Sequence, residues 1–240
     1  MKAMILAAGR GERMRPLTDK CPKPLLKVKG KALIEYHIES LIKAGVKDIV
    51  INHAWLGQKI VETLGDGKRW GINIQYSHEN QALETAGGII KALPLLAGSE
   101  NDEFIVVNGD IYTDYDFTRI SAKALDKPVQ AHLVMVENPK HHPKGDFSIN
   151  QKGFLLQDDS NEKFTFSGIA KYHIDFFTTL ADLYQQKPEP LAPLLIKAIK
   201  HLKVTGEVFR GYWSDVGTIE RLQETNQFVL SGLSSEKAPN

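Results

Sequence analysis

The chain has 240 residues, and its 30 Lys and Arg residues offset 29 Asp and Glu residues to leave a formal charge of +1. This balance excludes the broad basic surface that non-specific nucleic-acid binding requires, so any phosphate chemistry must use a local cluster of charges. Hydrophobic residues make up 42% of the chain and charged residues 25%, as in ordinary globular proteins. The single cysteine, Cys21, excludes an internal disulfide and a multi-cysteine metal site.

The amino-terminal apolar stretch covers only residues 3–9 and runs directly into charged residues, so it lacks the cleavage region of a signal peptide. No apolar run in the chain approaches the length that spans a bilayer. The single cysteine also favours a reducing compartment. We therefore expect a cytoplasmic protein with no membrane partner and no nucleic-acid partner.

Short apolar segments alternate with helix-period segments through the first half of the chain, which is typical of crossover units around a mainly parallel sheet. Beyond residue 136 the spacing favours antiparallel strands around a Lys152-Gly153 turn. We therefore expect an α/β fold, with a Rossmann-like, mainly parallel sheet flanked by helices and a small antiparallel addition. The predicted strands are 3–7, 48–52, 72–76, 104–108, 131–136, 147–149, 154–157, 164–172 and 208–213, and the predicted helices are 32–44, 58–64, 85–93, 191–199 and one from Thr218.

The chain shows no internal repeat and no proline-rich linker. We therefore expect a single domain over residues 1–230. The last ten residues, 231–240, are polar and too few to bury a core, so we expect them to form a disordered tail.

A loop rich in glycine and arginine follows the first predicted strand. Its glycines let backbone N–H groups approach an anion closely, and arginine side chains can bind phosphate oxygens in pairs. The third glycine of a dinucleotide-binding fingerprint falls at Met14, and the lysine of a P-loop counted from Gly9 falls at Arg15, so neither motif is present. The loop is either a different phosphate cradle or a solvated surface loop.

One lysine, Lys23, lies between Pro22 and Pro24. The two prolines stiffen the backbone, so the ammonium group is presented from a fixed support, which suits a charge clamp on phosphate. A surface lysine in a proline-rich turn is the alternative.

Two carboxylates, Asp110 and Asp215, each follow an apolar segment of strand length. Because open α/β sheets place ligands at strand ends, both side chains could hold one Mg²⁺, which prefers oxygen ligands and is commonly bound by one or two carboxylates with substrate phosphates. Either aspartate alone is also a common helix cap or turn residue.

Histidine and tryptophan give weaker signals. The adjacent pair His141-His142 lacks the spaced partners of a zinc site, so we expect a structural or surface role. Trp55, Trp70 and Trp213 are expected to pack within the fold and not to stack on a base.

Taken together and in this order, the motifs resemble those of the sugar-1-phosphate nucleotidyltransferases. The family pattern begins with a glycine- and arginine-rich loop followed by Pro-Lys-Pro-Leu. One departure is Glu84, because many relatives have glycine at this position, and base selection cannot be copied from them. The loop also has one extra residue between Arg13 and Pro16. The matching stretches are residues 9–18, 22–25, 83–88, 108–110 and 213–218.

The resemblance implies that UTP and a sugar 1-phosphate are joined with Mg²⁺ as cofactor, giving a UDP-sugar and pyrophosphate. It assigns the nucleotide to residues of about 1–125 and the sugar to about 126–230. Several relatives carry additional segments for assembly, whereas only a brief tail follows the last predicted helix here, and we expect a monomer. The implied catalytic residues are Arg13 and Lys23; the nucleotide-binding residues are Ala8, Gly9, Gly11, Glu12, Arg13, Lys23, Ser77, Ala82 and Thr85; the sugar-binding residues are Asn108, Asp146 and Ser167; and the metal ligands are Asp110 and Asp215.

Two alternatives stay open. A guanylyl- or thymidylyltransferase acting on mannose or glucose 1-phosphate would use the same phosphate-binding residues. A non-catalytic nucleotide-sugar sensor would tolerate the loss of Lys23 or of either aspartate, so the joint presence of these three residues argues against a sensor.

Overall fold

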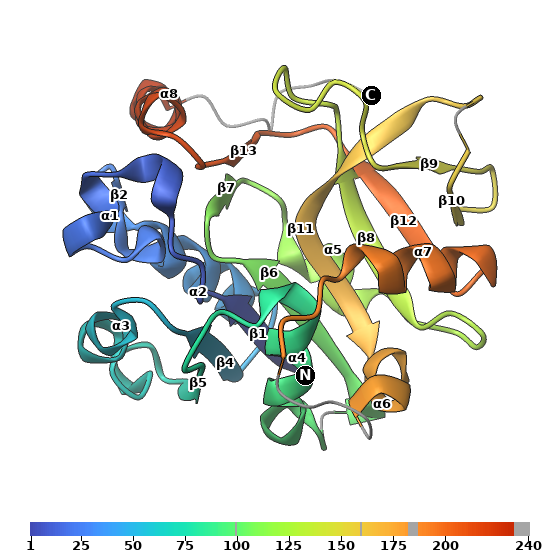
Figure 1. Cartoon of the computed structure of the whole chain (residues 1–240), viewed down its shortest axis with the longest axis horizontal. Coiled ribbons are helices and arrows are strands. Elements are labelled where there is room, and N and C mark those ends of the chain that lie inside the picture. The colour runs from blue at the N-terminus through green and yellow to red at the C-terminus, as the bar shows by residue number, and fades with distance from the viewer. Residues whose placement is uncertain (99, 159, 182–186, 233–240) are drawn as a thin grey trace.

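The computed structural model describes residues 1–98, 100–158, 160–181 and 187–232, and Figure 1 shows how its elements are arranged. Within these residues, a nine-stranded sheet carries helices on both faces, and two smaller two-stranded sheets lie beside it. The predicted α/β fold, with a parallel part and an antiparallel addition, is confirmed.

The first half of the chain builds the parallel part of the large sheet. Leu6 pairs in register with Asn52 on one side and with Asn108 on the other, and Asn52 pairs in turn with Ser77. The parallel strands therefore end at one common edge, which is where open α/β sheets bind ligands. The elements of this half are β1 (Lys2–Leu6), α2 (Leu33–Lys43), β4 (Asp48–His53), α3 (Gly57–Leu64), β5 (Asn73–His78), α4 (Glu84–Leu96) and β6 (Glu103–Asn108).

Alternate residues of the central strands face opposite helical layers, because successive side chains of a strand point to opposite faces. Ala3 and Ile5 pack in a core with α2, α3 and α5 (Phe117–Ala122), whereas Met4 packs in a second core with α4, α6 (Asp175–Ala181) and α7 (Ala192–Lys200). Both faces of β1 are covered, which explains why its sequence is continuously apolar from residue 3 to residue 6.

The second half of the chain adds mostly antiparallel strands. The long strand β11 (Lys163–His173) pairs with β6, β8 (Ala131–Val136) and β9 (Phe147–Ile149), and β10 (Leu155–Leu156) extends the sheet beyond β9. All residues of β8 are buried, as the sequence predicts for a central strand. The register of β11 shifts between Phe166 and Ile169, which marks a β-bulge.

The prediction of one strand over residues 208–213 is wrong. The chain forms β12 (Val204–Phe209), which pairs with β8, and then β13 (Trp213–Asp215), which pairs with β7 (Ile111–Thr113) in a separate sheet. A side chain at Gly211, between the two strands, would overlap the Phe209 ring and lie 2.7 Å from Asp114 Oδ1. The chain therefore leaves the large sheet after β12 and passes through Gly211 into the two-stranded sheet. Asp215 is the last residue of β13.

A third, smaller core joins the loop after β1 to the last helix, α8 (Ile219–Ser231). Only short helices follow β1, because prolines at 16, 22 and 24 interrupt this segment. The remaining elements are η1 (Glu12–Met14), α1 (Leu17–Lys20), η2 (Lys23–Leu25), β2 (Lys27–Val28), β3 (Lys31–Ala32), η3 (Lys68–Trp70) and η4 (Glu100–Asp102). The residues of the small core are Met14, Leu26, Val28, Leu33, Val216 and Leu222.

Across the described ranges, no helix has both the length and the apolar character needed to cross a membrane. The predicted tail, residues 231–240, falls mostly outside the described residues, and α8 runs through Ser231. The division into a nucleotide part and a sugar part stays a prediction.

Candidate active site

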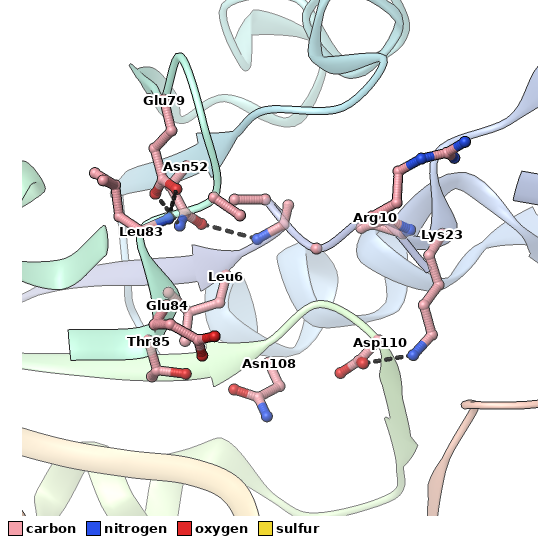
Figure 2. A pocket seen from close by; sticks show the side chains of 15 residues that line it. Leu6, Arg10, Lys23, Asn52, Glu79, Leu83, Glu84, Thr85, Asn108 and Asp110 are labelled. Carbon is pink, nitrogen blue, oxygen red and sulfur yellow. Dashed lines mark hydrogen bonds and ion pairs between the residues drawn. The ribbon is translucent and has the colours of Figure 1, made fainter. Parts of the chain in front are cut away.

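A cavity of about 370 Å³ opens at the edge where β1, β4 and β6 end. Figure 2 shows Glu84 and Thr85 on one side of it, Lys23 and Asp110 on the other, and Asn108 between them. The residues that line the cavity are Leu6, Ala7, Ala8, Gly9, Arg10, Lys23, Pro24, Asn52, Glu79, Ala82, Leu83, Glu84, Thr85, Asn108 and Asp110.

The loop after β1 is packed directly against Lys23. Gly11 has a φ of 68°, and a Cβ at this position would lie 3.0 Å from Thr18 Cγ2 and 3.3 Å from Lys23 Cβ. The Thr18 hydroxyl donates to the Gly11 carbonyl at 2.8 Å. Gly11 is therefore required both by its left-handed backbone and by the close approach of the lysine segment. Gly9, in contrast, faces open space.

Lys23 and Asp110 meet at the mouth of the cavity. Lys23 is mostly buried, and its ammonium group donates to Asp110 Oδ2 at 2.6 Å. Asp110 follows Gly109, whose N–H donates to the Leu6 carbonyl at 2.9 Å and where a Cβ would lie 2.8 Å from that same oxygen. The tight turn after β6 therefore holds Asp110 against the end of β1.

The two predicted metal ligands come from neighbouring positions in the fold. Asp215 pairs in register with Ile111, and the Val216 N–H donates to the Asp110 carbonyl at 2.9 Å. The side chain of Asp215 contacts Arg221, and its Oδ1 lies 3.0 Å from His141 Nε2. Two carboxylates on adjacent strands supply the oxygen donors that a hard divalent cation prefers, so the residues present fit such an ion.

A buried histidine supports the strand that follows Asp110. His37 of α2 lies with its Nε2 2.9 Å from the Ile111 carbonyl of β7. Complete burial lowers the pKa of His37 to about 4, because the charged imidazolium is disfavoured away from water. At neutral pH the ring is therefore uncharged and acts as a hydrogen-bonding support between α2 and β7.

The opposite wall of the cavity rests on a hydrogen-bond chain that the sequence did not predict. Asn52 Oδ1 accepts from the Ala7 N–H at 2.8 Å, and its Nδ2 donates to Glu79 Oε1 at 2.7 Å. The other oxygen of Glu79 accepts from the Leu83 N–H at 2.9 Å. This chain, drawn with dashed lines in Figure 2, connects the loop after β1 to the turn that begins α4.

Glu79 is 1% exposed, and burial raises the pKa of its carboxyl group. A Cβ at Gly88 of α4 would lie 2.8 Å from both Asn52 Nδ2 and Glu79 Oε1. Only glycine therefore lets α4 pack on the hydrogen-bonded pair. The sequence signal for this wall is slight: a polar Asn52 directly after the apolar run 49–51, at the same strand end as the predicted ligands.

The first residue of α4 is Glu84, the departure noted in the sequence. Glu84 has a φ of 60°, the left-handed conformation that glycine adopts without strain. The turn is held by the Glu189 N–H, which donates to the Leu83 carbonyl at 2.9 Å, and by the Gly87 N–H, which donates to the Glu189 carbonyl at 3.1 Å. Ala82 and Thr85, two of the predicted nucleotide-binding residues, line the cavity on this side.

The predicted sugar-binding residues are only partly brought together. Asn108 lines the cavity and packs on Gly168, where a Cβ would lie 2.5 Å from Asn108 Nδ2. Ser167, beside this glycine in the bulge of β11, is buried, and its carbonyl accepts from Trp213 Nε1 at 2.9 Å. Asp146 does not line the cavity; it accepts from the Phe166 N–H at 2.8 Å.

Several other predicted residues also lie outside the cavity lining. Arg13 is exposed, and its Nη2 would lie 3.2 Å from a Cβ at Gly217, so it faces the segment after Asp215. Arg10 lines the cavity in its place and stacks on the ring of Trp55, with 3.5 Å between the guanidinium carbon and the ring centroid. Trp55 is 38% exposed, and its Nε1 donates to the Thr18 carbonyl at 3.1 Å, so it packs on the loop after β1 and not in a core. The predicted residues that do not line the cavity are Gly11, Glu12, Arg13, Ser77, Asp146, Ser167 and Asp215.

The chain belongs to the nucleotidyl transferase family, whose model matches residues 2–232. Members of this family act on a nucleoside triphosphate and a sugar 1-phosphate and generally use a divalent metal ion. The predicted family resemblance is therefore confirmed.

Three individual proteins illustrate how similar the chain is to members of this family and to solved structures with its fold. The chain is 50% identical over 228 residues to N-acetylmuramate α-1-phosphate uridylyltransferase of Neisseria meningitidis, covering 93% of this chain and 96% of that protein. It is 30% identical over 246 residues to mannose-1-phosphate guanyltransferase of Yarrowia lipolytica, covering 98% of this chain but 66% of that longer protein. A putative glucose-1-phosphate thymidylyltransferase of Bacillus anthracis has the same fold, with a TM-score of 0.82 at 22% identity over 95% of this chain and 94% of that one.

Proposed function

We propose that this protein transfers a uridylyl group from UTP to N-acetylmuramate α-1-phosphate, giving UDP-N-acetylmuramate and pyrophosphate, and that it serves peptidoglycan recycling in the cytoplasm. The observation that carries the proposal is the 50% identity to a uridylyltransferase for this sugar phosphate over nearly the full length of both chains. The free Cys21 agrees with a reducing compartment.

The reaction needs charge neutralisation and alignment more than a protein nucleophile. An ionised oxygen of the sugar phosphate attacks the α-phosphorus of UTP, a new phosphorus–oxygen bond forms, and the bond to the bridging oxygen of the β-phosphate breaks, so that pyrophosphate leaves with its electron pair. No protein base is required, because the attacking oxygen already carries its charge. The enzyme must instead hold two polyanions in line.

We assign the phosphates to the loop and lysine side of the cavity. The backbone around Gly9 and Gly11, together with Arg13, would hold the triphosphate, and Lys23 would contact the α-phosphate or the sugar phosphate. Support comes from the packing of Gly11 against Lys23, which fixes the loop relative to the segment that carries the lysine. The further residues assigned to the triphosphate are Ala8 and Glu12.

We assign the base to the α4 side and the sugar to the β11 side. Ala82 and Thr85 would lie against the uracil, with Ser77 close behind in β5. Asn108, Ser167 and Asp146 would contact sugar or ribose hydroxyl groups. Asn108 has the strongest support, because it lines the cavity and touches the bulge that carries Ser167.

Asp110 and Asp215 would hold Mg²⁺ with the substrate phosphates. When bound, the ion would neutralise charge on the phosphate oxygens of the reacting groups. Lys23 contacts Asp110 through Oδ2, and Arg221 and His141 contact Asp215 through Oδ1, so the other oxygen of each carboxylate would be available to the ion.

Pyrophosphate release tests the proposal. Purified protein is incubated with Mg²⁺, each of UTP, GTP, dTTP and ATP, and each of N-acetylmuramate, N-acetylglucosamine, mannose and glucose 1-phosphates. We expect the highest kcat/KM for UTP with N-acetylmuramate 1-phosphate. Turnover of GTP with mannose 1-phosphate in preference to this pair would overturn the proposal and favour a guanylyltransferase. No turnover with any pair, together with tight UDP-sugar binding, would favour a sensor.

A further inference from the structure

The carboxylate of Asp215 is held by two side chains from different parts of the chain. Arg221 belongs to the first turn of α8, where Thr218 caps the helix and its hydroxyl accepts from the Arg221 N–H at 3.3 Å. His141 belongs to the loop between β8 and β9. Arg221 Nη1 and His141 Nε2 both contact the same oxygen, Asp215 Oδ1, and lie 2.8 Å from each other. The pair therefore already binds a carboxylate.

Both contacts of this pair use Asp215 Oδ1, which leaves Oδ2 to face a divalent cation, as in the proposed function. The Arg221 side chain is only 14% exposed, and among the described residues Asp215 is the one carboxylate in ion-pair contact with it. A guanidinium carries five N–H donors in a fork, and a single carboxylate oxygen does not use them all. Arg221 therefore has donors left for a second anion while it keeps its contact with Asp215.

The surroundings of the pair are positive and lie on the sugar side of the metal ligands. Arg13 and Arg221 both approach Gly217, where a Cβ would overlap Arg221 Nη2 and lie 3.2 Å from Arg13 Nη2. The neighbour of His141, His142, lies with its Nε2 3.0 Å from Asp146 Oδ1. The pair is thus placed between the segment after Asp215 and a residue assigned to the sugar.

We propose that Arg221 and His141 form the receptor for the carboxylate of the sugar substrate. The chemical class is a sugar 1-phosphate that carries an acidic ether substituent, as the lactyl group of N-acetylmuramate does. Arg221 supplies a charge-assisted hydrogen bond to that carboxylate, and His141 supplies the second donor. The inference rests on the proposed function for the identity of the substrate. It implies that Arg221 and His141 cause the enzyme to prefer the acidic sugar phosphate over neutral ones.

The test compares two sugars that differ only in the lactyl group, N-acetylmuramate and N-acetylglucosamine 1-phosphates, with UTP and Mg²⁺. We expect Arg221→Gln to lower kcat/KM for the acidic sugar by about 10²-fold, because one partner of a charge pair is lost, and for the neutral sugar by only a few-fold. His141→Ala should change the ratio in the same direction by a smaller factor. Turnover of the neutral sugar reports in the same sample that each variant is folded.

Two further measurements separate this role from a structural one. Lys144→Ala removes an exposed positive charge from the same loop, and we expect the sugar preference to stay within about threefold of the wild type, as for an exposed charge. Calorimetry of each sugar phosphate without UTP should show the preference of the wild type for the acidic sugar in Mg²⁺. That preference should be lost in Arg221→Gln, which lacks the guanidinium group.

Equal losses for both sugars in Arg221→Gln would overturn the inference, because Arg221 would then act only by positioning Asp215. A shift in Lys144→Ala as large as that in Arg221→Gln would also overturn it, since a diffuse positive field would explain the preference. Failure of the proposed function is visible separately, in the wild type alone: a wild type that uses the neutral sugar better, or neither sugar, refutes the function, and the inference falls with it.

Discussion

The two sides of the candidate active site are held by different kinds of interaction. On the side proposed for the base, Asn52 and Glu79 are 3% and 1% exposed and link Ala7 to Leu83 by hydrogen bonds. On the side proposed for the metal ion and the sugar, Asp110 forms an ion pair with Lys23, and Asp215 contacts Arg221 and His141.

This difference separates a preformed wall from a more accessible one. A buried hydrogen bond is expensive to break, because each group would be left without a partner away from water. In the pairs with Lys23 and Arg221 the carboxylates are the more open to solvent: the side chains of Asp110 and Asp215 are 40% and 27% exposed, whereas those of Lys23 and Arg221 are 10% and 14% exposed. We therefore expect the base wall to be formed before substrate arrives, and the two carboxylates to remain accessible to a metal ion.

Replacing either Asp110 or Asp215 should cause the largest loss of activity. We expect Asp110→Asn and Asp215→Asn each to lower kcat by roughly 10³-fold, since a metal ion is commonly worth several kcal/mol in the transition state. The double variant should lose little more than either single one, because both residues serve one ion. Pyrophosphate release measures the rates, and thermal melting should show no large change.

Asp116→Asn is the matched control, because Asp116 caps α5 by accepting from the Thr118 N–H at 2.9 Å and lies outside the cavity. Asparagine also caps helices, so activity should be unchanged. Independent, multiplying losses in the Asp110 and Asp215 double variant, or full activity in excess chelator, would contradict a shared metal site.

Lys23→Ala should have the next largest effect. We expect kcat/KM to fall by roughly 10²-fold, because a positioned cation at developing phosphate charge is lost, and Lys23→Arg should rescue poorly, since a forked guanidinium does not reproduce a compact ammonium group. Lys20→Ala, an exposed lysine of the same segment, is the control. Near-normal turnover of Lys23→Ala would show that the lysine serves only as a charge partner of Asp110.

Asn52→Ala should remove the hydrogen-bonded link between Ala7 and Glu79, and its largest effect should be on stability. Loss of the amide leaves the Ala7 N–H and Glu79 Oε1 without partners, which costs about 2 kcal/mol in the free energy of unfolding. We also expect KM for UTP to rise about tenfold while kcat changes less. Asn73→Ala removes an exposed amide that donates to Asp48 and should be nearly neutral. Equal effects of the two variants on unfolding would show that the buried chain is not what holds the wall.

The sequence predicted most of the fold because its signals are local. Apolar runs and helix-period segments lie next to each other in the chain, so the strands at 48–52, 104–108 and 131–136 agree with β4, β6 and β8 within one residue at each end. The prediction of one strand over residues 208–213 failed because the chain changes sheets at Gly211. This segment is held there by Asp114, which is nearly a hundred residues away in the chain.

The residues of the candidate site also divide into those that belong to local motifs and those whose partners are distant in the chain. Gly11, Lys23 and Asp110 belong to short motifs that a sequence displays directly. Asn52 and Glu79 act through partners 45 and 27 residues apart, so no motif contains them. The contact of His141 with Asp215 is of the same long-range kind, which is why a surface role was expected for that histidine.

The small core that joins Met14 to Val216 and Leu222 has a consequence for local unfolding. Outside this core, α8 is held by the stacking of Phe228 on Tyr212 and by Asn226, which accepts from the Lys29 N–H at 2.8 Å. These contacts are few beside those of the central sheet, so we expect this part of the molecule to open at a lower free energy. Such an opening would release the loop after β1 and the strand that carries Asp215 in one event, because both are anchored in the same cluster. The loop after β1 and one of the two carboxylates would then be assembled, and lost, together.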